Sequence, residues 1–149
     1  MKKIFVLCFL VLILGCIRVV DCGTDLLCFK KISKECSPGK ILLQHEGNKV
    51  LIMLRGMDKD NCVISVKVEE IGEKFKQKYP LESTELRGKT VNCWAPKKYG
   101  SYREEVSYFN EIINMSNNLD KMCRGQLKDI LEGPLRNILV DEFNRLLSE

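Results

Sequence analysis

The chain has 149 residues, of which 45% are hydrophobic and 30% are charged, and its formal net charge is +4. This length and apolar content suit one folded domain and argue against an intrinsically disordered chain, which would hold far fewer apolar residues. From residue 16 onward, 22 basic and 20 acidic side chains are interspersed. A nucleic-acid-binding protein normally concentrates its basic residues on one face or element, so we expect no nucleic-acid partner.

The first predicted element is a signal peptide at residues 1–15. Lys2 and Lys3 form a short positive region, and residues 4–14 are an unbroken apolar run. A run of this length in a helix spans roughly 16 Å, about half of the hydrocarbon core of a membrane. It therefore fits the hydrophobic region of a signal peptide better than a transmembrane helix, and we expect the chain to be exported.

The apolar run ends in Ile13-Leu14-Gly15-Cys16, which resembles the lipobox of prokaryotic lipoproteins. In such proteins a diacylglycerol is attached to the cysteine thiol, and the chain is cleaved just before that cysteine. The resemblance implies that Cys16 is lipidated and that the membrane is a partner through this anchor. The alternative is an ordinary secretory signal in which Cys16 is only a small residue near the cleavage site.

The number of cysteines is consistent with cleavage before Cys16. This cleavage discards Cys8, commits Cys16 to lipid and leaves six cysteines, an even number that suits disulfide formation outside the cell. Cleavage after Val20 also leaves six, whereas cleavage after Gly23 leaves five. The six disulfide candidates are Cys22, Cys28, Cys36, Cys62, Cys93 and Cys123.

Sequence alone cannot choose among the pairings that six cysteines permit. We expect one local bridge among the first three, with the remaining member joined to the body of the domain, and a second bridge between two of Cys62, Cys93 and Cys123. Zinc binding is disfavoured because the chain has no C-x-x-C pair and a single histidine, His45. We therefore expect neither a metal site nor a cofactor.

Residues 16–39 are predicted to form a cysteine-rich lead-in to a globular domain at residues 40–149. Within the lead-in, residues 25–33 favour one or two turns of helix, which Pro38 and Gly39 would end. The adjoining part of the domain contains two apolar runs at residues 41–45 and 49–56, joined by a hairpin at residues 46–48, and then a polar turn at residues 57–61.

The clearest predicted strand is "CVISVKVEEI" at residues 62–71. Its residues alternate, so that Cys62, Ile64, Val66 and Val68 share one face, as in a half-buried antiparallel strand. The run at residues 89–96 predicts another strand, in which Trp94 points away from the face that carries Val91 and Cys93. Trp94 is a candidate contact residue, although cover by the lead-in or by a helix is the favoured interpretation.

The remaining segments favour helices. The charged stretch at residues 73–89 predicts a helical turn or a loop, broken at Pro80. In the last third, Ser101 and Glu104 fit a capping box, and three apolar stripes have helical spacing. The stripes comprise Val106, Phe109, Ile112 and Ile113; Leu119, Met122, Cys123, Leu127, Ile130 and Leu131; and Leu135, Ile138, Leu139, Leu146 and Leu147.

The predicted fold class is therefore α+β: a small antiparallel sheet of three to four strands, with C-terminal helices packed on one face and disulfides joining the elements. No nucleophile, zinc or phosphate-loop motif is present. A Cys–His pair would need a free thiol near His45, and the cysteines are expected to be bridged. We therefore expect that the protein is not an enzyme and has no catalytic residues.

Five short motifs carry a further resemblance: "DCGTDLLCF", "CSPGK", "DKDNCVISVKV", "LRGKTVNC" and "MCRGQLKDIL". They resemble motifs of small exported cysteine-rich proteins and lipoproteins of archaea and bacteria, over residues 21–131. The resemblance implies a disulfide-stapled exported domain with a C-terminal helix that bears Cys123, but it implies no activity. Gly39 departs from that group, in which alanine follows the proline. The matching positions are Cys22, Cys28, Cys36, Pro38, Cys62, Cys93 and Cys123.

These observations favour a non-enzymatic lipoprotein domain of the cell envelope, which binds or scaffolds an extracytoplasmic protein partner at the outer face of the cytoplasmic membrane. The alternative is a freely secreted disulfide-rich effector or inhibitor. The two interpretations differ in one covalent feature, the lipid on Cys16.

Overall fold

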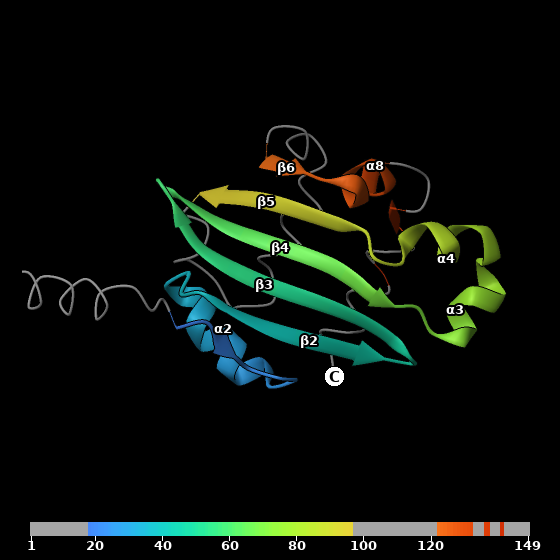
Figure 1. The fold of residues 1–149 in the computed structure, drawn as a ribbon, viewed down its shortest axis with the longest axis horizontal. Coiled ribbons are helices and arrows are strands. Elements are labelled where there is room, and N and C mark those ends of the chain that lie inside the picture. Colours follow the sequence, from blue (N-terminus) through green and yellow to red (C-terminus); the bar gives the residue numbers. More distant parts are fainter. Residues whose placement is uncertain (1–17, 97–121, 133–135, 138–140, 142–149) are drawn as a thin grey trace, which may run out of the picture.

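The computed structural model describes residues 18–96, 122–132, 136–137 and 141. They form a six-stranded sheet with helices along its two edges and beyond one of its ends (Figure 1). In chain order the elements are β1 (Val20–Asp21), α2 (Leu26–Lys34), β2 (Gly39–His45), β3 (Asn48–Asp58), β4 (Asn61–Glu70), α3 (Glu73–Lys78), α4 (Pro80–Leu86), β5 (Thr90–Pro96), β6 (Cys123–Arg124) and α8 (Gln126–Glu132).

The strands lie side by side in the order in which they occur in the chain. Strand β1 is parallel to β2, and every other neighbouring pair is antiparallel. The α+β class is confirmed, but the prediction of three to four antiparallel strands is wrong, because the sheet is mixed and has six strands. The additional strands β1 and β6 have two residues each, too few to show an alternating pattern in the sequence.

A two-residue turn determines the register of strands β2 and β3. Between β2 and β3, the chain reverses through Glu46 and Gly47, whose φ values are +48° and +83°. Positive φ at both central residues is the geometry of a type I′ turn, which suits the twist of a two-residue hairpin. The predicted hairpin is thus confirmed, with Asn48 already paired to His45 at the start of β3.

The core lies on one face of the sheet, called the inner face. Along β4, Cys62, Ile64, Val66 and Val68 are all buried, which confirms the alternation predicted from the sequence. Most of their neighbours across the sheet are also buried, since paired residues share a face, but Met57, opposite Cys62, is 42% exposed. The buried inner-face residues of the other strands are Ile41, Leu43, Ile52, Leu54, Val91, Cys93, Ala95 and Cys123.

Helices contribute to this core from several parts of the chain. Leu26, Phe29 and Ile32 of α2 pack against it, and Figure 1 shows α2 beside β2 at one edge of the sheet. Phe75 of α3 and Leu86 of α4 are also buried. The charged segment between β4 and β5 is thus mainly helical, and Pro80 occupies the first turn of α4, where its missing N–H costs no hydrogen bond.

The C-terminal prediction is corrected at one point. Cys123 lies in β6, directly opposite Cys93 in β5, and not in a helix as its place in the apolar stripe suggested. Gly125, with a φ of +130°, separates β6 from α8, whose Leu127 enters the core. The other two predicted stripes, at residues 106–113 and 135–147, lie largely or wholly outside the described residues. Within the described ranges, none of the helices has both the length and the apolar character needed to span a membrane.

Candidate functional site

Three disulfides join the six candidate cysteines: Cys22–Cys28, Cys36–Cys62 and Cys93–Cys123. This is the distribution expected from the sequence, with one local bridge in the lead-in, one link from the lead-in to the sheet and one bridge further along the chain. Five of these cysteines are buried, so the bridges belong to the core. None of these six sulfur atoms is a thiol.

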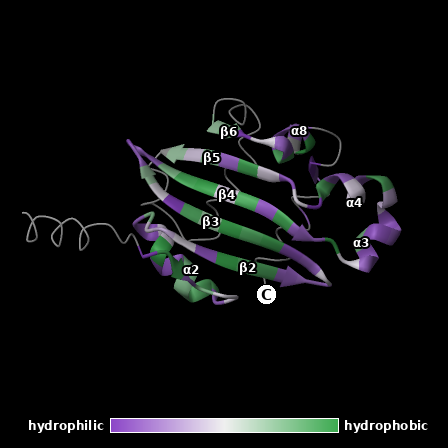
Figure 2. Ribbon diagram, viewed as in Figure 1, coloured by the Kyte–Doolittle hydropathy of each residue, from purple (hydrophilic) through white to green (hydrophobic). Residues whose placement is uncertain are grey.

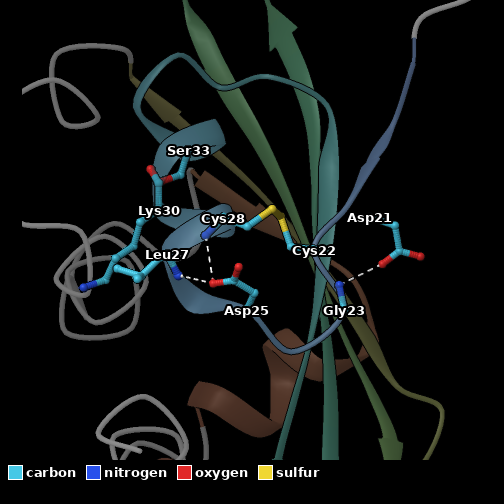
Figure 3. Close-up of a disulfide and its surroundings, with 8 residues drawn as sticks. All are labelled: Asp21, Cys22, Gly23, Asp25, Leu27, Cys28, Lys30 and Ser33. Atoms are coloured by element: carbon cyan, nitrogen blue, oxygen red, sulfur yellow. Dashed lines mark hydrogen bonds between the residues drawn. A yellow bond between two sulfur atoms is a disulfide. The ribbon is translucent and has the colours of Figure 1, made fainter.

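The first bridge joins the lead-in to its own helix. Asp25 begins α2 as its N-cap, and its Oδ1 accepts hydrogen bonds from the backbone N–H groups of Leu27 at 2.8 Å and Cys28 at 3.1 Å (Figure 3). These bonds satisfy backbone donors that a helix start otherwise leaves unpaired. The first turn of α2 is therefore fixed both by its cap and by the disulfide between Cys28 and Cys22.

The same stretch of chain holds β1 against β2. Val20 N–H donates to the Pro38 carbonyl at 3.0 Å, and Cys22 N–H donates to the Lys40 carbonyl at 2.9 Å. Asp21 forms a salt bridge with Lys40 at 2.9 Å. The hydrogen bond from Lys40, assisted by that from the Gly23 N–H, lowers the pKa of Asp21. A lowered pKa means that this contribution to stability is present above the ordinary pKa and is lost as the pH falls through the folded value.

Opposite the core, the sheet has a second face, called the outer face, where the alternate residues of each strand lie. Among the helices that the structure describes, none lies in front of strands β3 to β5 in Figure 1. In Figure 2, whose colours include the residues of both faces, hydrophobic residues predominate along the middle of β2 to β4, whereas β5 contains a hydrophilic stretch. By register, the outer face carries Leu42, Leu51, Met53, Val63, Ser65, Lys67, Asn92, Trp94 and Arg124, and a hydrogen bond to Ser65 places Arg55 there as well.

A polar network crosses three strands of the outer face. Arg55 Nε donates to Ser65 Oγ at 3.2 Å, and Ser65 Oγ donates to Asn92 Oδ1. Ser65 is buried, and these bonds satisfy its hydroxyl group. The sequence does not indicate a role for Arg55 or Asn92. Neither residue is near Ser65 in the chain, and the three meet only because β4 lies between β3 and β5.

Trp94, the candidate contact residue, lies on the outer face as the alternation predicted. Its Nε1 donates to Asp58 Oδ2 at 3.0 Å. The guanidinium carbon of Arg124 lies 6.0 Å from the centre of the indole ring, at the limit of a cation–π contact. These contacts come from the end of β3 and from β6, whereas the favoured interpretation from the sequence was cover by the lead-in or a helix. The indole is half-buried, so part of it is accessible to a partner.

The bond from Trp94 to Asp58 gives a first prediction. In Asp58→Ala, the free energy of unfolding should fall by at most about 1 kcal/mol, because an exposed hydrogen bond contributes little net stability. Asp60→Ala, in the same turn, removes the same charge without removing this bond and should cost less than half as much. The measurement is urea unfolding followed by the fluorescence of Trp94, the single tryptophan of the chain. Equal losses in the two variants would contradict this role for Asp58.

His45 lies at the end of β2, beside the hairpin turn. Within the described parts of the chain, no three His, Cys, Asp or Glu side chains are grouped in a way that could hold a metal ion. Cys16, the predicted lipidation site, lies outside the described residues, and so does the predicted signal peptide.

No protein-family model matches the chain, and comparison with curated proteins and with solved structures finds no significant match. The resemblance to small exported cysteine-rich proteins therefore stays a prediction.

Proposed function

We propose that the mature protein is a non-enzymatic domain, anchored by lipid on Cys16, that binds or scaffolds a protein partner at the outer face of the cytoplasmic membrane. The observation that carries this proposal is the pairing of all six cysteines from Cys22 to Cys123 with one another. A chain cleaved before Cys16 would have no other cysteine left to pair with Cys16. Its thiol would then be available for the lipid that the lipobox-like sequence implies.

The same disulfides support an exported protein. Structural disulfides form and persist in oxidising compartments, whereas the cytosol keeps most thiols reduced. The bridges here are built into the core, since Cys36, Cys62, Cys93 and Cys123 are all buried. A fold of this kind is best suited to a compartment in which the sulfur atoms stay oxidised.

Binding is favoured over catalysis by what the described side chains do. The six described cysteines are bridged, so none offers the thiolate that a Cys–His nucleophile requires. The outer face instead presents a partly accessible tryptophan beside an arginine, two residue types that are enriched where proteins bind one another. An unidentified extracytoplasmic protein is the partner we propose for this domain.

The anchor is tested by comparing the wild type with Cys16→Ser in a detergent phase-partitioning experiment. We expect the wild type in the detergent phase and Cys16→Ser in the aqueous phase, because a diacylated and N-acylated cysteine holds a protein stably on a membrane. Cys8→Ser is the matched control, since Cys8 lies in the predicted signal peptide and its loss should leave the partitioning unchanged. The intact mass of the mature wild type should correspond to cleavage before Cys16, added acyl chains and three oxidised cysteine pairs.

The alternatives give different results. If Cys16→Ser stays in the detergent phase as fully as the wild type, the anchor on Cys16 is wrong. If the mature wild type begins after Cys16, carries no lipid and is found in the medium, the protein is a freely secreted disulfide-rich effector or inhibitor.

A further inference from the structure

One edge of the domain lies close to the proposed lipid on Cys16, and the role of this edge rests on that lipidation. Only residues 17–19 lie between Cys16 and the first residue of β1. Since each residue of an extended chain spans at most about 3.6 Å, the Cα atoms of Cys16 and Val20 can be no more than roughly 14 Å apart. The polar headgroup region of one leaflet is itself about 5–7 Å thick. An anchored domain would therefore have β1 close to the lipid headgroups.

The short connection matters because β1 belongs to the folded domain. Its backbone is bonded to β2 on both sides of Asp21, and the Leu42 N–H donates to the Gly23 carbonyl at 2.7 Å just beyond the strand. The disulfide from Cys22 to Cys28 then fastens this segment to α2, with the two Cα atoms 5.6 Å apart. No flexible linker separates the end of β1 from the core, so an anchor on Cys16 would restrict the orientation of the whole domain.

The surface at this edge exposes large apolar side chains, as a surface that contacts a membrane would. Val19 is 58% exposed, Val20 37% and Leu27 75%, and these are three of the five large hydrophobic side chains that the described residues expose. Leu27 lies in the first turn of α2, next to the disulfide-bonded Cys28. The edge therefore presents apolar side chains to its surroundings within a few residues of the proposed anchor.

Basic side chains lie in helix α2, whereas β1 carries the acidic Asp21, which is paired with Lys40. Leu27, Lys31 and Lys34 are exposed and have the spacing of residues that share one stripe of a helix. Helix α2 carries Lys30 as well and has no acidic residue between its first and last positions. Figure 3 shows Leu27 and Lys30 pointing away from the strands of the sheet. Lysines beside exposed apolar side chains are the pattern that favours an anionic lipid surface.

We propose that the anchor edge, defined as residues 18–20 and the exposed stripe Leu27, Lys31 and Lys34 of α2, lies against anionic phospholipid headgroups. The lipid on Cys16 supplies attachment, and the anchor edge determines which side of the domain faces the membrane. The helices α3 and α4, at the end of the sheet away from α2 in Figure 1, then lie away from the membrane surface.

The test uses the lipidated wild type, reconstituted in vesicles of two parts phosphatidylcholine to one part phosphatidylglycerol or of phosphatidylcholine alone. Lysines are acetylated with a water-soluble reagent, and the rate at each lysine is read by mass spectrometry. We expect Lys31 to react roughly threefold more slowly on the anionic vesicles, because apposition to the headgroups limits access of the reagent. Lys78, beside the exposed Leu81 at the junction of α3 and α4, should react equally on both kinds of vesicle.

Substitution tests the apolar contact. In Leu27→Glu the protection of Lys31 should be lost, whereas Leu81→Glu, which places the same charge on another exposed leucine, should leave it unchanged. Both side chains are largely exposed, so neither substitution should disturb folding, and the three disulfides and the circular dichroism spectrum verify this. An equal rate at Lys31 on both kinds of vesicle, or unchanged protection in Leu27→Glu, would overturn the proposal.

The two levels of the proposal fail in different ways. If the wild type carries no lipid and does not float with either kind of vesicle, the anchor itself is wrong and the membrane-facing edge is rejected with it. If the wild type carries lipid and floats, but Lys31 is not protected on anionic vesicles, only the orientation is wrong.

Discussion

A Cys36→Ala/Cys62→Ala double variant should have a free energy of unfolding about 3.5 kcal/mol below that of the wild type, as expected when a 26-residue separation is no longer cross-linked. The chain-entropy argument gives only about 2.2 kcal/mol for Cys22→Ala/Cys28→Ala, whose cysteines are six residues apart. Both cysteines of a pair are replaced, so that no unpaired thiol is left to form a wrong bridge.

Urea unfolding of the two double variants, with the other disulfides kept oxidised, measures the difference. The longer link also joins the end of the lead-in to β4, at two buried positions, so its loss removes the cross-link between the lead-in and the central sheet. If Cys22→Ala/Cys28→Ala proves as destabilising as Cys36→Ala/Cys62→Ala, the local bridge does more than close a short loop, and the entropy argument fails for this domain.

Gly72→Ala should cost about 3 kcal/mol or more, at the upper end of the usual range for an overpacked site. The backbone of Gly72 is ordinary, with a φ of −68°, so the cost is not one of conformation. A Cβ at this position would lie 2.2 Å from the carbonyl oxygen of Glu46 and 3.0 Å from the carbonyl carbon of Gly47. Both are backbone atoms of the hairpin turn and cannot move without moving the turn.

The close approach also places a buried hydrogen bond, in which the Gly72 N–H donates to Asn48 Oδ1 at 2.7 Å. Moving the turn would break this bond and leave a buried amide unsatisfied, which adds to the loss. Gly88→Ala is the matched control. Gly88 has a φ of +76° and open space around it, so alanine there should cost only about 1–2 kcal/mol of backbone strain. Thermal or urea unfolding compares the two, and an equal or smaller loss in Gly72→Ala would show that the turn can yield.

The central strands could be predicted because their physical cause is local. Residues 62–68 alternate so regularly that the buried face of β4 is visible in the sequence, and Trp94 follows from the same rule applied to β5. The turn at Glu46 and Gly47 could also be located. A strand of two residues has no such signature, so β1 and β6 were missed, and with them the sheet's parallel edge.

Cys123 shows how a local pattern can mislead. Its spacing from Met122 and Leu127 fits a helix, yet a partner 30 residues earlier in the chain holds it in a strand. The outer face has the same limitation. The partners of Trp94 are Asp58 and Arg124, which are distant from it in sequence, so their meeting depends on the strand order and not on the composition of any one segment.

The order of the strands has a consequence for how such a chain would be assembled while it crosses a membrane with its N-terminus leading. Each newly emerged strand finds its neighbour already outside, because spatial and sequential order coincide. The six described cysteines pair in the same succession, first with second, third with fourth and fifth with sixth. If the chain is exported as proposed, oxidation in order of arrival would yield the native links directly, and no bridge formed early would have to be opened and exchanged later.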